Sequence, residues 1–261
     1  IINIGGPSQS SGTQYTLSCY AKRNDSGTQS FGFFKNGSGA VDSAMSLTNE
    51  WQRFDYTYTA SNNSQLGLAG SSGADVSVYG FQVEASASYP SSYIPTHGAA
   101  VTRGADIVDG KEDSSLYNDS EGVLFVEFSA LADSGRDNQW RFLISDGSNG
   151  NRVQIGLPNT TNNLYASCIA GGVTSADMTH TLNNASSNHK VAIKYKANDF
   201  AMYVDGIEVD TDTSGSTPTG LDIFDFYRTP NNNNYVEANV KQVLYFKTAL
   251  TNAELADLTT L

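Results

Sequence analysis

The sequence predicts an all-β protein made of two antiparallel β-sandwich domains of jelly-roll type, with one short helix at its C-terminus. Three observations lead to this prediction. Short runs alternate apolar and polar residues, clusters of Gly, Ser and Asn separate these runs at intervals of about 8 to 12 residues, and no helical crossover lies between them. The 24 glycines and the modest hydrophobic content of 39% fit a chain rich in turns.

Length and charge narrow the classes of function. The 261 residues suffice for two domains of about 100 to 150 residues each. A formal net charge of −12 repels a phosphate backbone, so we expect no nucleic-acid partner. No apolar run approaches the length of a membrane span, so membrane insertion is not expected either. Cys19 and Cys168 lie in alternating apolar runs, which predicts two buried thiols rather than a disulfide.

The alternating runs are predicted strands, because successive side chains of a strand point to opposite faces of its sheet. In the first half they are Tyr15–Ala21, Ser30–Phe34, Trp51–Thr59, Gln65–Ala69 and Ala74–Val83. In the second half they are Gly122–Ser129, Gln139–Asp146, Arg152–Leu157, Leu164–Ile169, Lys190–Lys196, Phe200–Val204, Ile207–Thr211, Leu221–Tyr227 and Ala238–Phe246. Trp51, at the start of its strand, is predicted to pack in the core.

Two of these segments give more specific predictions. Lys190–Lys196 places three apolar residues on one face and three lysines on the other, which predicts a strand with one solvent-facing side. Asp205 and Gly206 separate two apolar runs and are the residue types that a two-residue type I′ turn requires. We therefore expect a hairpin between 200–204 and 207–209.

Only the end of the chain has a helical pattern. Thr251 and Glu254 form a capping box, and Leu255 follows it. Between the two halves, the proline-containing segment 89–98 interrupts the alternation and predicts an extended connector. We therefore expect a first domain at 1–88, a connector at 89–119 and a second domain at 120–261, with the boundary near residue 105.

The chain also carries a set of segments that occur together in one group of proteins. They are Trp51–Phe54, Asp75–Glu84, Ser92–Thr96, Val101–Asp106, Lys190–Lys196, Phe200–Gly206 and Val240–Leu255. Together they resemble bacteriophage tail and virion proteins in which a carbohydrate-binding-module-like jelly roll precedes a laminin-G/concanavalin A-like domain. Such tandems also occur in secreted bacterial proteins.

The resemblance implies that the second domain is concanavalin A/laminin-G-like and that the protein belongs to a trimeric fibre, with either further copies of itself or other virion proteins as partners. It also implies further strands ahead of Tyr15–Ala21. The first domain is therefore expected to lack N-terminal strands, which an upstream segment or a neighbouring chain would supply.

Candidate catalytic groups are sparse in the sequence. Sandwich glycanases of the retaining type hold two carboxylates about 5 Å apart. Glu127 has no acidic neighbour on its strand, while Asp222 and Asp225 alternate onto opposite faces. The histidines fall in loops or at strand starts and are predicted surface side chains: His97, His180 and His189. We therefore predict a protein that is not an enzyme.

One loop resembles a calcium site. Asp210, Asp212 and Ser214 alternate as in the opening of an oxygen-rich calcium loop, and Gly215 permits a sharp turn. Leu221 stands where the closing Glu would be, so an ordinary solvated loop is the preferred interpretation. A structural calcium ion is the single cofactor that the sequence suggests.

Saccharide recognition combines aromatic faces with hydrogen-bonding side chains, and both types are plentiful here. The predicted glycan-binding residues flank one strand end or lie in an Asn-rich loop bracketed by tyrosines. They are Trp140, Asp146, Asn149, Arg152, Tyr227, Arg228, Asn232, Asn234 and Tyr235.

The leading functional hypothesis is a non-catalytic glycan-binding adhesin of a phage tail fibre or another virion protein, which docks reversibly on a bacterial surface glycan. Its expected location is the virion or the extracellular space. Two alternatives stay open. The protein is a purely structural fibre spacer or capsid decoration, or it is the accessory binding region of a secreted polysaccharide lyase or hydrolase.

Overall fold

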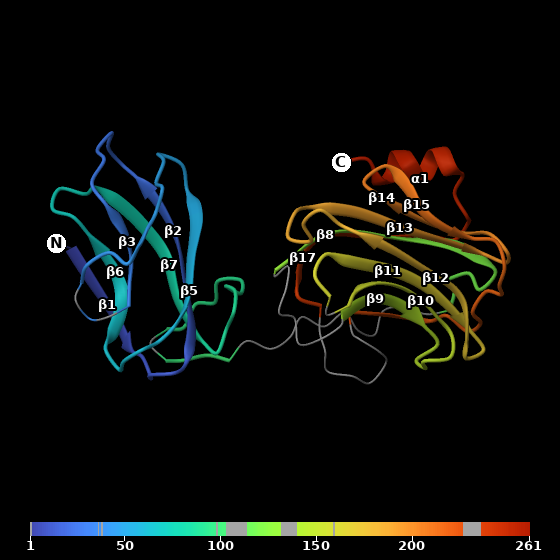
Figure 1. The fold of residues 1–261 in the computed structure, drawn as a ribbon, viewed down its shortest axis with the longest axis horizontal. Helices are drawn as coiled ribbons and strands as arrows, with labels where there is room; N and C mark the ends of the chain where they lie inside the picture. Colours follow the sequence, from blue (N-terminus) through green and yellow to red (C-terminus); the bar gives the residue numbers. More distant parts are fainter. Residues whose placement is uncertain are drawn as a thin grey trace. The chain divides into compact units, whose positions relative to one another are not determined.

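The computed structural model describes residues 2–35, 37, 39–97, 99–102, 114–131, 140–158, 160–226 and 236–261. The chain divides into two compact units, Ile1–Gly104 and Ala105–Leu261 (Figure 1). Strands in both units pair antiparallel, and one short helix lies at the C-terminal end, so the predicted fold class is confirmed. No helix in the described part of the chain has the length and apolar character needed to cross a membrane.

The first unit is a sandwich of a four-stranded sheet in the order β1-β6-β3-β4 and a three-stranded sheet in the order β5-β2-β7. Its strands are β1 (Ile2–Ser8), β2 (Gln14–Arg23), β3 (Phe31–Phe34), β4 (Ser43–Ala44), β5 (Gln52–Thr59), β6 (Gln65–Gly70) and β7 (Val76–Ala85). Leu17, Cys19 and Phe33 belong to the core between the sheets, together with Leu66 and Leu68. Alternate residues of β2 therefore face inward, as the sequence predicts.

The second unit is a sandwich of two five-stranded sheets, in the orders β12-β11-β10-β9-β16 and β15-β14-β13-β8-β17 (Figure 1). The first sheet contains β9 (Trp140–Ser145), β10 (Arg152–Leu157), β11 (Asn163–Ala170), β12 (Val173–Thr181) and β16 (Ile223–Asp225). The second contains β8 (Glu121–Ala130), β13 (His189–Lys196), β14 (Phe200–Val204), β15 (Ile207–Asp212) and β17 (Ala238–Phe246). The helix α1 spans Asn252–Thr259.

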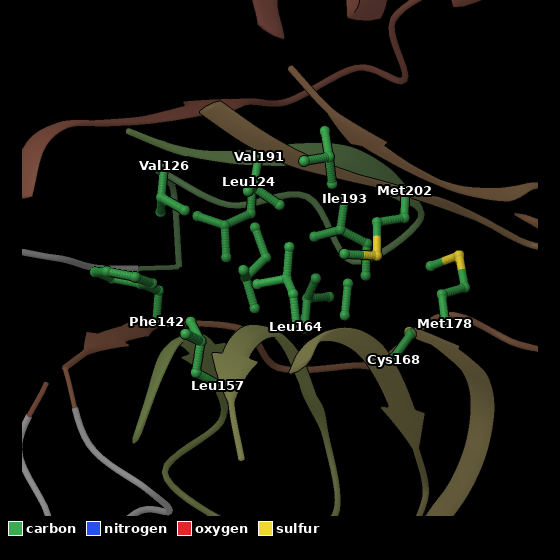
Figure 2. Packing of buried hydrophobic residues seen from close by; sticks show 14 of the residues in the cluster. Leu124, Val126, Phe142, Leu157, Leu164, Cys168, Met178, Val191, Ile193 and Met202 are labelled. Carbon is green, nitrogen blue, oxygen red and sulfur yellow. The ribbon is translucent and has the colours of Figure 1, made fainter. Parts of the chain in front are cut away.

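The core of the second unit lies between its sheets. Figure 2 shows Leu157 and Leu164 reaching up from one sheet toward Leu124, Val191 and Ile193 of the other. All five side chains are fully buried. The alternation of β8, β10 and β13 thus places their apolar residues on the inner faces, and burial of these side chains supplies the main stabilisation of the sandwich.

Both cysteines are buried, and neither forms a disulfide, which confirms the prediction. Cys168 lies in the core of the second unit, and Cys19 lies in that of the first. Burial disfavours the charged thiolate and raises the pKa of each thiol to about 12.

The prediction of a solvent-facing side for Lys190–Lys196 is wrong at the centre of the strand. The helix α1 covers this side of the sheet, and Leu255 packs with Ala192 and Tyr203 in a second apolar cluster (Figure 1). Lys194 is only 7% exposed, and its Nζ lies 2.6 Å from an Asp199 carboxylate oxygen. A buried lysine needs such a partner, and the aliphatic stem of the side chain contributes apolar surface.

The turn between β14 and β15 has the predicted type I′ character. Asp205 and Gly206 both have positive φ, at 50° and 87°. The Asp205 carboxylate accepts a hydrogen bond from the backbone N–H of Lys190 (2.9 Å) and lies 2.7 Å from Nδ1 of His189. His189 is 7% exposed, so the prediction that it is a surface side chain is wrong.

The chain after β7 folds back on the outer face of the β5-β2-β7 sheet. The Ile94 N–H donates to Gln82 Oε1 (2.9 Å), and the Ser91 N–H donates to a Glu84 carboxylate oxygen (3.0 Å). Arg53 donates to the Ser91 carbonyl oxygen. Part of the segment 89–98 is thereby bonded to the β5-β2-β7 sheet.

Trp51 is not a core residue, which corrects a second prediction. It immediately precedes β5 and is 49% exposed. The core contacts of that strand come from Phe54, Tyr56 and Tyr58. The inward-facing residues of β5 are at even positions, so Trp51, at an odd position like Arg53, falls on the outer side of the sheet.

Candidate functional site

The second unit contains a cleft of about 480 Å³ beside β12 and β15, which are edge strands of its two sheets. One wall is the hairpin between β11 and β12, and the other is the segment that follows β15. The lining residues are mostly small and polar: Ala170, Val173, Thr174, Ser175, Asp212, Ser214, Gly215 and Ser216. We refer to this set as the hydroxyl-lined cleft. Its volume lies within the range of about 300 to 1,000 Å³ that is typical of small-ligand sites.

A glycine and one hydrogen bond hold the walls of the cleft together, and a second hydrogen bond ties the loop after β15 to Asn198. Gly215 has a φ of 145°, and a Cβ at this position would lie 2.5 Å from the Ser175 carbonyl oxygen. The neighbouring Ser216 N–H donates to Ser175 Oγ (3.2 Å), and the Gly215 N–H donates to Asn198 Oδ1 (3.0 Å). The close approach therefore requires glycine and brings Ser175 next to the loop after β15.

Asp212 supplies the carboxylate of the cleft. Its Oδ1 accepts hydrogen bonds from the Ser214 N–H (2.9 Å) and from Ser214 Oγ (3.2 Å), which closes a local turn. These bonds fix the carboxylate and leave Oδ2 without a hydrogen bond to any described residue. Asp212 can thus accept hydrogen bonds from a ligand without losing its structural role.

The residues predicted to bind calcium separate into two groups. Asp212 and Ser214 line the cleft, whereas Asp210 Oδ2 accepts a hydrogen bond from the Thr179 N–H (3.0 Å) on β12. Across the described residues, no group of three or more His, Cys, Asp and Glu side chains is placed to hold a metal ion. Asp210 thus bonds to β12 and does not line the cleft beside Asp212 and Ser214, and the calcium assignment stays a prediction.

The loops beside the cleft are joined through Asn151. Its Oδ1 accepts hydrogen bonds from the Gly171 N–H (3.0 Å) and the Thr219 N–H (3.2 Å). Its Nδ2 donates to Asp146 Oδ2 (2.9 Å), and Asp146 Oδ1 accepts from the Ser148 N–H (2.8 Å). Burial opposes ionisation of Asp146, but these hydrogen bonds outweigh it and lower the pKa of the carboxyl group. Asp146 is therefore a structural acceptor.

A second polar feature occupies the outer face of the β9-β10-β11 part of the sheet. Gln154 Oε1 accepts from Arg141 Nη1 (3.0 Å) and from Arg152 Nε (3.0 Å), and its Nε2 donates to Ser167 Oγ (2.6 Å). The guanidinium of Arg141 lies over the Tyr165 ring, 5.4 Å from its centroid. We refer to these five residues as the arginine network.

The electrostatics of the arginine network follow from burial and from two adjacent positive charges. Burial, and then the charge of Arg141, lower the pKa of Arg152. Burial raises the pKa of Tyr165 to about 12, although Arg141 and Arg152 oppose the shift. The phenol therefore stays protonated at neutral pH and is a neutral hydrogen-bonding group.

The structure brings some of the predicted glycan-binding residues close to one another. Arg152 belongs to the arginine network and donates to the carbonyl oxygen of Asn149 in the loop that also holds Asp146. Trp140 begins β9, but its side chain lies outside the described residues. The Asn-rich loop also lies outside them, with Tyr227, Arg228, Asn232, Asn234 and Tyr235. All nine assignments remain predictions.

Two groups of residues were missed. The β12 side of the cleft, Thr174 and Ser175, belongs to a strand that the sequence does not predict. Gln154 and Ser167 alternate with core residues on predicted strands. The alternation in the sequence places both side chains on the outer face of the sheet. It does not show that Gln154 is paired with Ser167 on the neighbouring strand.

A family model described as "Concanavalin A-like lectin/glucanases superfamily" (laminin G type) matches residues 129–256. The second unit thus contains a laminin-G/concanavalin A-like domain. No curated protein sequence matches the chain.

Solved structures similar to the chain include the CBM40 of a Ruminococcus gnavus IT-sialidase, bound to α2,3-sialyllactose. Its TM-score is 0.47 at 13% identity, over 60% of this chain and 97% of that chain. A leech intramolecular trans-sialidase has a TM-score of 0.45 at 14% identity, over 58% of this chain and 26% of that chain. The binding domain of botulinum neurotoxin DC has a TM-score of 0.43 at 12% identity, over 56% of this chain and 36% of that chain.

Proposed function

We propose that the protein is a non-catalytic glycan-binding module and that its second unit binds a saccharide in the hydroxyl-lined cleft. The cleft itself is the observation that carries this proposal. It combines the hydroxyl groups of Thr174, Ser175, Ser214 and Ser216 with the carboxylate of Asp212, inside a laminin-G/concanavalin A-like domain.

The chemistry of the cleft suits a polyhydroxylated ligand. Asp212 Oδ2 accepts from sugar hydroxyls, while the serine and threonine hydroxyls both donate and accept. Val173 is 67% exposed at the mouth of the cleft and offers an apolar contact for a C–H face. Each contact is weak, so tight attachment requires several copies that bind one polysaccharide at a high effective concentration.

The biological role that we propose is adhesion: the module belongs to a phage tail fibre or another virion protein and attaches to a bacterial surface glycan. The resemblance of segments such as Ser92–Thr96 to tandem modules of virion proteins supports this role. A fibre spacer and an accessory region of a polysaccharide lyase or hydrolase remain the alternatives. Adsorption of beads coated with the full chain to a panel of bacterial cells separates adhesion from a spacer role. A spacer would leave the beads unbound.

The binding experiment uses a glycan array probed with multivalent full-length chain, followed by titration of the bound glycan. Asp212→Asn keeps an acceptor oxygen for Ser214 but removes the charge, and a loss of about tenfold in affinity is expected. Asp257→Asn makes the same chemical change on the exposed surface of α1 and should leave affinity unchanged.

The outcomes separate the two polar features of the second unit. If Arg152→Gln weakens binding and Asp212→Asn does not, the saccharide binds at the arginine network and the placement in the cleft is wrong. If no glycan is retained at multivalent display, the glycan-binding function itself is rejected.

A further inference from the structure

The first unit exposes aromatic rings on the outer face of its three-stranded sheet. Tyr79 is 59% exposed and Trp51 is 49% exposed. Among the described residues, the exposed large hydrophobic side chains of this unit are these two rings and Val101, whereas those of the second unit are all aliphatic. Aromatic exposure is thus concentrated on one face of one unit.

Strand register places these rings in two adjacent rows. Tyr20 on β2 is opposite Arg53 on β5 and opposite Tyr79 on β7. The Tyr20 and Tyr79 ring centroids lie 6.3 Å apart, and Tyr93 continues the row at 5.3 Å from Tyr79. Side chains two positions apart on a strand share a face, so Lys22 on β2 lies on the same face as Tyr20. Lys22 and the Trp51 ring that it contacts form the second row.

Cations lie against the rings of both rows. The Nζ of Lys22 is 5.5 Å from the centroid of the Trp51 ring, and the guanidinium carbon of Arg53 is 5.8 Å from that of Tyr20. Neither cation forms an ion pair with a carboxylate in the part of the chain that the structure describes. Each positive charge is therefore placed beside a sugar-sized aromatic face and is not neutralised there.

The segment after β7 holds the rings in place. Gly80 has a φ of 63°, and a Cβ there would lie 3.2 Å from the Tyr93 ring, so the ring packs directly on the backbone of β7. Arg53 donates to Ser18 Oγ (3.2 Å) and to the Ser91 carbonyl oxygen. Because these groups are ordered before any ligand arrives, binding would cost little conformational entropy.

We propose that Trp51, Tyr20 and Tyr79, together with Lys22 and Arg53, form a second binding surface that takes a glycan chain bearing carboxylate groups. We call it the aromatic surface. The rings pack against the apolar faces of successive sugars, and the two cations bind their carboxylates. Charge complementarity selects this occupant over a neutral chain. The proposal is independent of the cleft in the second unit.

The test uses full-length chain in affinity electrophoresis through gels that contain polygalacturonate, alginate or polysialic acid, and through gels with carboxyl-reduced polygalacturonate. Wild-type chain should be retarded by at least one carboxylated polymer and much less by the reduced one. The double variant Trp51→Ala/Tyr79→Ala should lose about tenfold or more in affinity, since both rings are exposed and contribute contact area.

Two further variants make the result specific. Lys22→Gln should reduce both the affinity and its dependence on salt, because one charge contact is removed. Val101→Ser changes an exposed apolar side chain of the same unit, so this variant should bind as wild type does. Urea unfolding of each variant shows that the fold is retained.

Three outcomes would overturn the proposal. Absence of retardation by all carboxylated polymers rejects the ligand class, and equal retardation by the reduced polymer rejects the role of the charges. Self-association of wild-type chain in light scattering, abolished by the double variant, would make the aromatic surface a contact between copies. Loss of cleft binding through Asp212→Asn leaves the aromatic surface intact, so the two proposals fail separately.

Discussion

The Asp205 side chain links a short turn to the neighbouring strand and to a buried histidine. It adopts a φ of 50° in the β14–β15 hairpin, receives a hydrogen bond from the Lys190 N–H and contacts His189. Nε2 of His189 lies 2.9 Å from the Asn184 carbonyl oxygen. The carboxylate thus joins the turn to β13 and orients a buried ring.

Replacement of Asp205 is expected to weaken the second unit. Asp205→Ala removes two hydrogen bonds and leaves a buried imidazole without one partner, so the free energy of unfolding should fall by about 1–3 kcal/mol. Asp205→Asn tolerates the left-handed backbone and keeps an acceptor, so its effect should be smaller. Urea unfolding curves measure both. Equal stability of the alanine variant and wild type would contradict the assignment.

The two thiols should be inert in the folded protein. Burial raises the pKa of Cys19 and of Cys168 from 9.0 to about 12, so both remain protonated at pH 8. A thiol reagent should modify no cysteine in native protein and two in urea. Above pH 9 the unfolded thiols ionise while the folded ones hold their protons, so stability should fall as pH rises. Rapid labelling of the native chain would show that a core opens.

At the scale of elements, alternation in the sequence was sufficient to predict strands with one apolar face. The structure confirms segments such as Arg152–Leu157 and Ala238–Phe246 at their predicted bounds. β1 and β12 were not predicted. β1 carries Gly5 and Gly6, which are typical of turns, and β12 is polar apart from the exposed Val173 at its start and Ala176 and Met178 on its inner side. Pairing with β6 and with β11 makes them strands.

The sequence also did not predict that α1 covers one face of a sheet. The capping box at Thr251 and Glu254 predicted the helix correctly. Which surface the helix covers depends on the path of the chain after β17, and that path is a tertiary property. The same limit applies to the cleft, because Asp212 and Ser214 are visible in the sequence whereas their approach to Ser175 is not.

A substitution in the loop after β15 tests how the cleft is built. Gly215→Ala combines an unfavourable φ of 145° with a Cβ 2.5 Å from the Ser175 carbonyl oxygen, so the loop must move. Saccharide affinity and stability should both decrease, the latter by about 1–3 kcal/mol. Gly171→Ala is the matched control, since its φ is 57° and a Cβ there meets nothing within 4 Å. An equal loss in both variants would show that backbone conformation alone is responsible.

At the scale of the whole molecule, the two units have separate cores. Leu17 belongs to the core of the first unit, and Ile193 belongs to that of the second. Each is fully buried, so replacement by alanine should cost about 2–5 kcal/mol in its own unit.

Calorimetry of the full chain should therefore show two thermal transitions. Leu17→Ala should lower the midpoint of one, and Ile193→Ala that of the other, because neither core includes residues of the other unit. A single transition that both substitutions shift together would instead indicate that the units unfold cooperatively.

The pairing of β8 with β17 has a consequence for synthesis on the ribosome. Val123 is paired with Phe246 and Ala130 with Ala238, so the first strand of the second unit lies beside its last. The paired strands of the first unit all fall within residues 2–85 and can assemble early. The second sandwich must wait until β17 has emerged, and until then β8 has an open edge that a chaperone or another nascent chain can occupy.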